Sequence, residues 1–132
     1  MRLQILARLK ATALLIATMI ALVSPASADV ARCVTAEGRT AIVEALPRAS
    51  EGRPVHITFR TRAEGVRLPE WLVAQYPNEM TVILQYQFER LVVRSAGFDV
   101  TVRFKGRPVR LTIPFDAVKA LWDNSIAQCG GA

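Results

Sequence analysis

The sequence is poor in the side chains that carry most catalytic and metal chemistry. Its 132 residues include one histidine, His56, and two cysteines, Cys33 and Cys129. These three residues show no ligand-pair spacing, so we predict neither a metal site nor a cofactor. The sequence also lacks a Gly-x-Ser-x-Gly elbow, a glycine-rich phosphate loop, a His-Glu-x-x-His pair and a Cys-x-x-Cys motif. The usual signatures of several large enzyme classes are therefore absent.

The polar residues that remain do not indicate catalysis. A hydrolytic triad would have to use His56, because the chain has no other histidine. His56 falls on the polar side of an alternating segment, which favours an exposed or hydrogen-bonded structural histidine over a catalytic base. No two of the 11 Asp and Glu residues stand out as an acid/base pair. The sequence predicts a binding protein and not an enzyme.

Acidic residues are missing from residues 1–28, which divide into the three parts of a secretory signal peptide. A basic start precedes an apolar run over residues 11–23, and Ala26 and Ala28 give the small-x-small pattern that signal peptidase requires. The run is shorter than the roughly twenty residues of a membrane-spanning helix. We predict cleavage after Ala28 and a single domain over residues 29–132, with membrane contact only during export. Retention as an uncleaved anchor is the alternative.

Much of the positive charge belongs to this leader. Residues 1–28 hold three of the 17 basic residues and none of the 11 acidic ones, so removing them lowers the formal charge from +6 to +3. Nucleic-acid binding needs a denser basic tract with exposed aromatic residues between the charges, and here the aromatic residues share the inward parity of the predicted strands. We expect no nucleic-acid partner.

Several arginines of the predicted domain can form a basic surface for carboxylates or phosphates. They are Arg60, Arg62, Arg103, Arg107 and Arg110. The alternative is a solvated sheet face on which such arginines pair with Asp99 or Glu89.

The two cysteines lie near opposite ends of the predicted domain, at Cys33 and Cys129. An oxidising compartment permits them to form a disulfide, which would restrict the unfolded chain and contribute roughly 4 to 5 kcal/mol. Two unrelated thiols are the alternative. We expect a periplasmic or secreted protein.

Turn residues divide the domain into short elements. A helix is predicted to begin near Thr35 and to stop at Pro47, although Gly38 within it lowers the helix propensity. Alternating apolar residues predict a strand over residues 55–60, and a second helix follows over residues 68–76. We expect a last helix after Pro114, with Phe115, Val118 and Trp122 on one side.

The segment from Met80 to Ile113 has the pattern of three or four antiparallel strands with tight turns. Its first strand is expected to bend at Glu89–Arg90, where the inward parity changes. A short meander covers its edges best by curling. The predicted fold class is mainly β, α+β: a small open antiparallel β-barrel with an N-terminal helix and short flanking helices.

Five segments in this order carry a family resemblance. They are HITFRT at residues 56–61, GVRLPEWL at 65–72, YPNEMTVILQYQF at 76–88, FDVTVRFKGRP at 98–108 and VRLTIPFDA at 109–117. Together they resemble the stringent starvation protein B (SspB) family in its alphaproteobacterial form. The resemblance implies a barrel related to the Sm fold, an N-terminal helix that pairs in a homodimer, and a groove for an extended peptide such as the ssrA degradation tag.

Members of that family deliver tagged proteins to the ClpXP protease through a C-terminal tail that docks on ClpX. The groove candidates in this chain are apolar residues of the predicted strands, and each of them can equally belong to the barrel core. They are Leu84, Tyr86, Phe88, Val102 and Phe104.

The leading hypothesis is an exported SspB-like module that binds an extended peptide or an unfolded segment. The signal peptide separates it from the cytoplasm, and the residues after Ser125 are not expected to supply a tail that docks on ClpX. One alternative is a cytoplasmic ClpXP specificity-enhancing adaptor whose start codon is misplaced. Another is a structural or oligomeric envelope protein.

Overall fold

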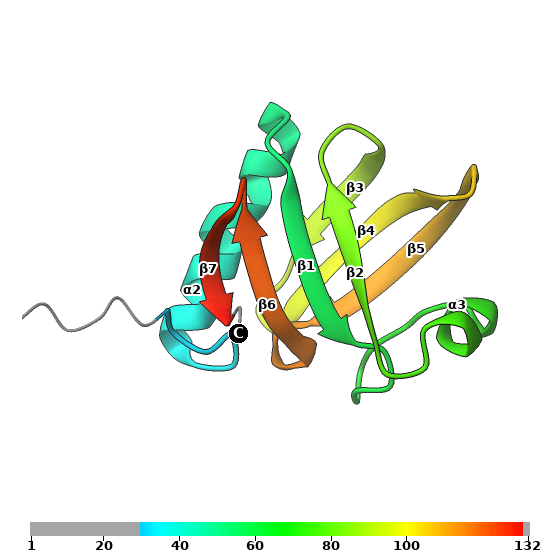
Figure 1. Ribbon diagram of the computed structural model, residues 1–132, viewed down its shortest axis with the longest axis horizontal. Helices are drawn as coiled ribbons and strands as arrows, with labels where there is room; N and C mark the ends of the chain where they lie inside the picture. Colours follow the sequence, from blue (N-terminus) through cyan, green and yellow to red (C-terminus); the bar gives the residue numbers. More distant parts are fainter. Residues whose placement is uncertain (1–29, 131–132) are drawn as a thin grey trace, which may run out of the picture.

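The computed structural model describes residues 30–130, which form two antiparallel sheets with one longer helix at their side (Figure 1). The predicted signal peptide and its cleavage site at Ala28 lie outside the described residues. The four-stranded sheet has the order β2-β1-β6-β7, and the three-stranded sheet has the order β3-β4-β5. The sheets are not closed into one ring. The predicted α+β class with an open barrel is confirmed.

The strands of the four-stranded sheet are β1 (Val55–Arg60), β2 (Glu79–Leu84), β6 (Val118–Asp123) and β7 (Ile126–Gly130). The strands of the three-stranded sheet are β3 (Phe88–Val93), β4 (Gly97–Phe104) and β5 (Arg107–Pro114). The helices are α2 (Ala36–Ala45), the 3-10 helix η1 (Leu46–Glu51), α3 (Glu70–Gln75) and the 3-10 helix η2 (Phe115–Ala117). The predicted elements at residues 55–60 and 68–76 are present as β1 and α3.

Helix α2 begins where the sequence predicts. The hydroxyl of Thr35 accepts a hydrogen bond from the Gly38 amide at 3.1 Å, which caps the first turn. Gly38 is buried, and a Cβ there would lie 2.0 Å from the carbonyl oxygen of Arg32. The glycine therefore lets the preceding segment cross the helix closely, which outweighs its low helix propensity.

Strand β4 is buried on both faces. Its inward side chains, Phe98, Val100 and Val102, belong to the apolar core, as their alternation predicts. Asp99 and Thr101 on the other face are also buried, because arginine side chains cover them. Arg94 donates to Asp99 at 2.9 and 2.6 Å. The centre of this sheet is therefore shielded from water by charged side chains as well as by the core.

Burial acts to raise the pKa of Asp99, but hydrogen bonds from Arg94 and Thr112 and the charges of Arg94 and Arg110 outweigh it. The pKa of Asp99 therefore lies below its ordinary value. The carboxylate is the form that the arginines around it stabilise.

The predicted last helix is wrong. After the short η2 the chain forms β6, which pairs with β1, and then β7, which pairs with β6. Asn124 and Ser125 between them both have positive φ values, of 49° and 74°, which suits a two-residue hairpin. The spacing of Phe115, Val118 and Trp122 fits a helix locally. Pairing with the otherwise free edge of β1 decides the outcome in favour of strands.

The segment predicted as one bent strand is two strands in different sheets. Strand β2 ends at Leu84, residues 85–87 form a turn, and β3 begins at Phe88. The register between β3 and β4 shifts between Glu89 and Val92, and Arg90 has a φ of 51°. The bend predicted at Glu89–Arg90 is therefore present as an irregularity within β3.

Cys33 and Cys129 form a disulfide, as predicted, with their Cα atoms 4.9 Å apart. Both residues are buried. The bond joins the segment that precedes α2 to β7, the last strand of the four-stranded sheet.

Within residues 30–130, no helix has the length and apolarity needed to span a membrane.

Candidate functional site

The five predicted groove residues occupy three different environments. Leu84 is 0% exposed and Val102 is also buried, so both contribute to the core. Phe88 and Phe104 are partly buried and pack against that core. Tyr86 is 77% exposed, because it lies in the turn between the two sheets and not on a strand. The inward parity predicted for Tyr86 is therefore wrong.

Tyr86 is nevertheless held in place by its surroundings. A Cβ on Gly52 would lie 3.1 Å from a ring carbon of Tyr86, so the ring rests against that glycine. The neighbouring Gln85 donates from Nε2 to the carbonyl of Gly52 at 2.9 Å. The turn between β2 and β3 is thus fixed on the loop that follows η1, with the phenol ring presented to solvent.

A hollow of about 230 Å³ lies next to this turn. It contains two of the predicted groove residues, Tyr86 and Phe88, together with Gln87, Glu89, Thr101 and Arg103. Its lining combines aromatic surface with one acidic and one basic side chain. Such a hollow suits an amphipathic ligand group better than a purely apolar one.

Phe104 belongs to a separate aromatic cluster. Its ring centroid lies 6.2 Å from that of Trp71 and 6.1 Å from that of Tyr76, with edge-to-face angles of 75° and 71°. The guanidinium carbon of Arg107 lies 4.8 Å from the centroid of the Trp71 ring. The sequence pattern does not predict this cluster, because Trp71 and Tyr76 come from α3 and its C-terminal cap, and only the folded chain brings them to the β4–β5 hairpin.

Among residues 30–130, strand β2 has the most regular edge that no other strand pairs with. It is the outermost strand of its sheet, and it pairs with β1 in unbroken register from Leu84 to Glu79. By contrast, the registers of β3 with β4 and of β7 with β6 are interrupted. The outer edge of β5 is engaged by an isolated bridge between Arg67 and Thr112.

The two aromatic features lie near opposite ends of β2. Helix α3 lies near the start of β2, and the turn to β3 leaves the other end of the strand (Figure 1). In the sequence, Tyr76 precedes β2, and Tyr86 and Phe88 follow it. Met80, Val82 and Leu84 of β2 point into the core, whereas Ile83 is 58% exposed. A regular backbone edge is thus flanked by two aromatic contact regions, an arrangement that can hold an extended chain.

The five arginines of the predicted basic surface do not gather at one place. Arg103 lines the hollow beside Tyr86, and Arg107 lies over Trp71. Arg110 donates to the Arg90 carbonyl at 2.7 Å and to the Thr101 hydroxyl at 3.1 Å. Within residues 30–130, none of Arg60, Arg103 and Arg110 forms a salt bridge with Asp99 or Glu89, although the charge of Arg110 acts on Asp99. Among residues 30–130 the only salt-bridge partner of Asp99 is Arg94.

His56 lies on β1, half-buried, in an open depression of about 420 Å³ that it lines together with Thr58, Thr81, Trp122 and Ser125. No carboxylate and no cysteine is among these lining residues. In the described part of the chain, no three His, Cys, Asp or Glu side chains are grouped so as to hold a metal ion.

Comparison with models of known protein families gives a match over most of the described residues. The family model described as SspB: Stringent starvation protein B matches residues 39–129. These residues include β1 to β6 and most of β7, whereas Cys33 lies outside them. A search of curated proteins found no significant match.

Proposed function

Because the chain belongs to the stringent starvation protein B family, we propose that it is an exported module that binds an extended peptide and does not catalyse a reaction. The family consists of adaptors that bind peptide tags and act with ClpX. Export would separate the module from the cytoplasm, so docking on ClpX is not part of this proposal. The homodimer that the family resemblance implies stays a prediction.

The free edge of β2 carries the proposal. A peptide in the extended conformation adds to such an edge through main-chain hydrogen bonds, while its alternate side chains enter neighbouring hollows. The six residues of β2 provide an edge of roughly 20 Å at about 3.3 Å per residue. A ligand segment of similar length fits this edge.

The aromatic regions supply the side-chain contacts in this proposal. Tyr86 and Phe88 would receive one part of the peptide, and Phe104 with Trp71 and Tyr76 would receive another. Aromatic rings with a partly exposed face are typical anchors of peptide interfaces. Leu84 and Val102, which are buried, would shape the site from the core without touching the peptide.

Replacing Tyr86 with alanine is expected to weaken binding of a fluorescently labelled ssrA-type peptide about tenfold. The side chain is 77% exposed and makes no core contact, so the domain should stay folded. Fluorescence anisotropy with the mature domain measures the affinity. Ile126→Ala, which removes another exposed apolar side chain on β7, is the matched control and should bind normally. Absence of saturable binding by the unchanged domain at high micromolar concentration would remove the peptide proposal.

Export predicts a mature protein whose first residue is Asp29. N-terminal sequencing of the protein recovered from the cell envelope or periplasm checks this result. Ala28→Tyr should block processing, because signal peptidase requires a small residue there, whereas Ala28→Ser should be processed normally. Recovery from the cytoplasm of a stable protein that begins at a start site downstream of Met1, and not at Asp29, would instead support an adaptor with a misplaced start.

A further inference from the structure

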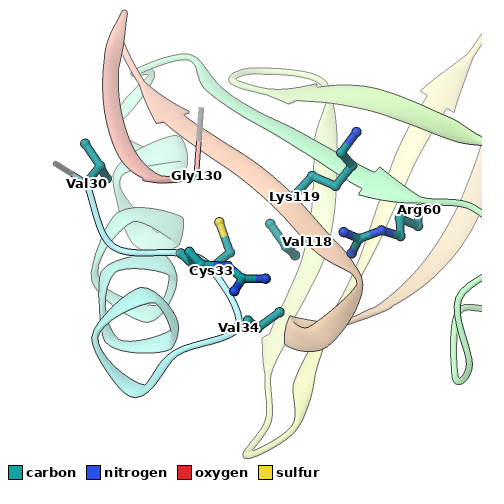
Figure 2. Close-up of a pocket in the computed structure, with 8 residues that line it drawn as sticks. Val30, Cys33, Val34, Arg60, Val118, Lys119 and Gly130 are labelled. Carbon is teal, nitrogen blue, oxygen red and sulfur yellow. The ribbon is translucent and has the colours of Figure 1, made fainter. Parts of the chain in front are cut away.

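A pocket of about 300 Å³ lies beside the disulfide, where the segment preceding α2 meets the ends of β1 and β6 (Figure 2). Three basic residues and three valines account for most of its lining. They are Arg32, Arg60, Lys119, Val30, Val34 and Val118. The segments that form it are far apart in the sequence, and none of the aromatic residues at the ends of β2 contributes to it.

Positive charge dominates this pocket. Lys119 forms a salt bridge with Glu79, whose backbone is the register partner of Arg60 across β1 and β2. Within residues 30–130, Arg32 and Arg60 have no carboxylate within salt-bridge distance. Among the described residues, three cations therefore face one acid, and the guanidinium groups of Arg32 and Arg60 can contact an external anion.

The backbone that carries Arg32 is fixed before any ligand arrives. The Cys33–Cys129 disulfide ties the segment to β7, and the Gly130 amide donates to the Ala31 carbonyl at 2.9 Å. The Arg32 carbonyl itself accepts from the amide and the hydroxyl of Thr35, at 3.1 and 2.7 Å. A ligand that binds here does not have to order this segment, which lowers the entropic cost of binding.

We propose that this pocket binds the C-terminal carboxylate of a peptide whose last residue has a small aliphatic side chain. A guanidinium presents parallel N–H groups that match the two oxygens of a carboxylate. The valines provide apolar contacts for a short side chain beside that carboxylate. The volume is large enough for one or two small residues. The proposal does not depend on peptide binding along β2.

The test is a calorimetric titration of the mature domain with acetyl-Ala-Val carrying a free carboxylate, and with the same dipeptide as an amide. We expect saturable binding of the acid and at least tenfold weaker binding of the amide. Arg60→Gln should weaken binding of the acid about tenfold, because a charge-assisted contact is lost. Arg62→Gln, an exposed arginine two residues further on, is the matched control and should bind normally.

Equal binding of the acid and the amide would overturn the proposal. So would equal effects of Arg60→Gln and Arg62→Gln, or inorganic phosphate binding as tightly as the dipeptide, because each indicates unspecific attraction of anions. Tyr86→Ala should leave binding of the dipeptide unchanged. The experiments therefore distinguish a pocket that does not bind the dipeptide from a β2 edge that does not bind the longer peptide.

Discussion

Removing the Cys33–Cys129 disulfide is expected to lower the free energy of unfolding by about 4 to 5 kcal/mol. The two cysteines are 96 residues apart in the sequence, so the bond closes a loop that includes nearly the whole described domain. In the loop-entropy account, a longer loop restricts the unfolded chain more and therefore stabilises the folded state more.

Urea denaturation of the Cys33→Ala/Cys129→Ala variant, followed by circular dichroism, measures this loss. The unchanged protein in reducing buffer is the control, because it lacks the bond but keeps both sulfur atoms. The two samples should lose similar stability, which would assign the effect to the bond and not to the side chains. A loss below about 1 kcal/mol would show that the unfolded chain is already restricted by other means.

This result also bears on the compartment in which the protein works. Domains of this size are stable by only about 5 to 15 kcal/mol in total. A loss of 4 to 5 kcal/mol would leave a reduced domain with little stability. An exported protein keeps the bond, whereas a cytoplasmic adaptor would have to fold without it. A reduced domain that stays stable would therefore favour the cytoplasmic alternative.

Replacing Asp123 with asparagine is expected to lower the free energy of unfolding by about 2 to 3 kcal/mol. The carboxylate is 2% exposed and accepts from Nη1 of Arg48 at 2.7 Å. Nε of Arg53 lies 3.4 Å from its other oxygen. The asparagine keeps the shape but leaves the two arginines without their counter-ion. Because Arg48 and Arg53 are 37% and 47% exposed, water can solvate them, and the loss stays below that of a fully buried pair.

Asp116→Asn is the matched control for this prediction. Asp116 pairs with Arg39 on the surface, where both side chains are well exposed. Exposed pairs contribute little, so this variant should change stability by less than about 1 kcal/mol. Thermal and urea denaturation of both variants provide the comparison. Equal losses would mean that burial of Asp123 does not strengthen its interaction with the arginines.

Strand β1 and the β4–β5 hairpin were predictable because their local pattern and their tertiary environment agree. In β1, Val55, Ile57 and Phe59 alternate with polar residues and all three are buried. The last helix was predicted wrongly because the apolar residues among 115–122 fit both the period of a helix and the alternation of a strand. Only the presence of β1 beside them makes the strand the better solution, and a single sequence window does not contain that neighbour.

In the candidate site, too, the local sequence pattern predicted some features and missed those that depend on tertiary contacts. Phe88 was correctly placed on a strand of the predicted meander, but the inward parity expected for Tyr86 was wrong. Parity alone treats residues 82–88 as one strand, and the turn at residues 85–87 breaks that assumption. Trp71 and Tyr76 fall within the helix predicted over residues 68–76, and the sequence predicts no aromatic partner for them. Their contact with Phe104 depends on how α3 docks, which no local pattern specifies.

The sequence by itself determined the mainly β class and the family, and it predicted the Cys33–Cys129 disulfide and the positions of β1 and α3. The fold class and the disulfide follow from periodicity, from turn residues and from a count of two cysteines, all of which are local or compositional. The family follows from the resemblance of five segments to stringent starvation protein B. The tertiary structure decided which sheet each strand joins, which edge stays free, and which charges meet. Buried Asp123 meeting Arg48 and Arg53, and the pocket between Arg32 and Arg60, arise from contacts between distant segments. Their energies depend on burial and distance, which exist only after the chain has folded.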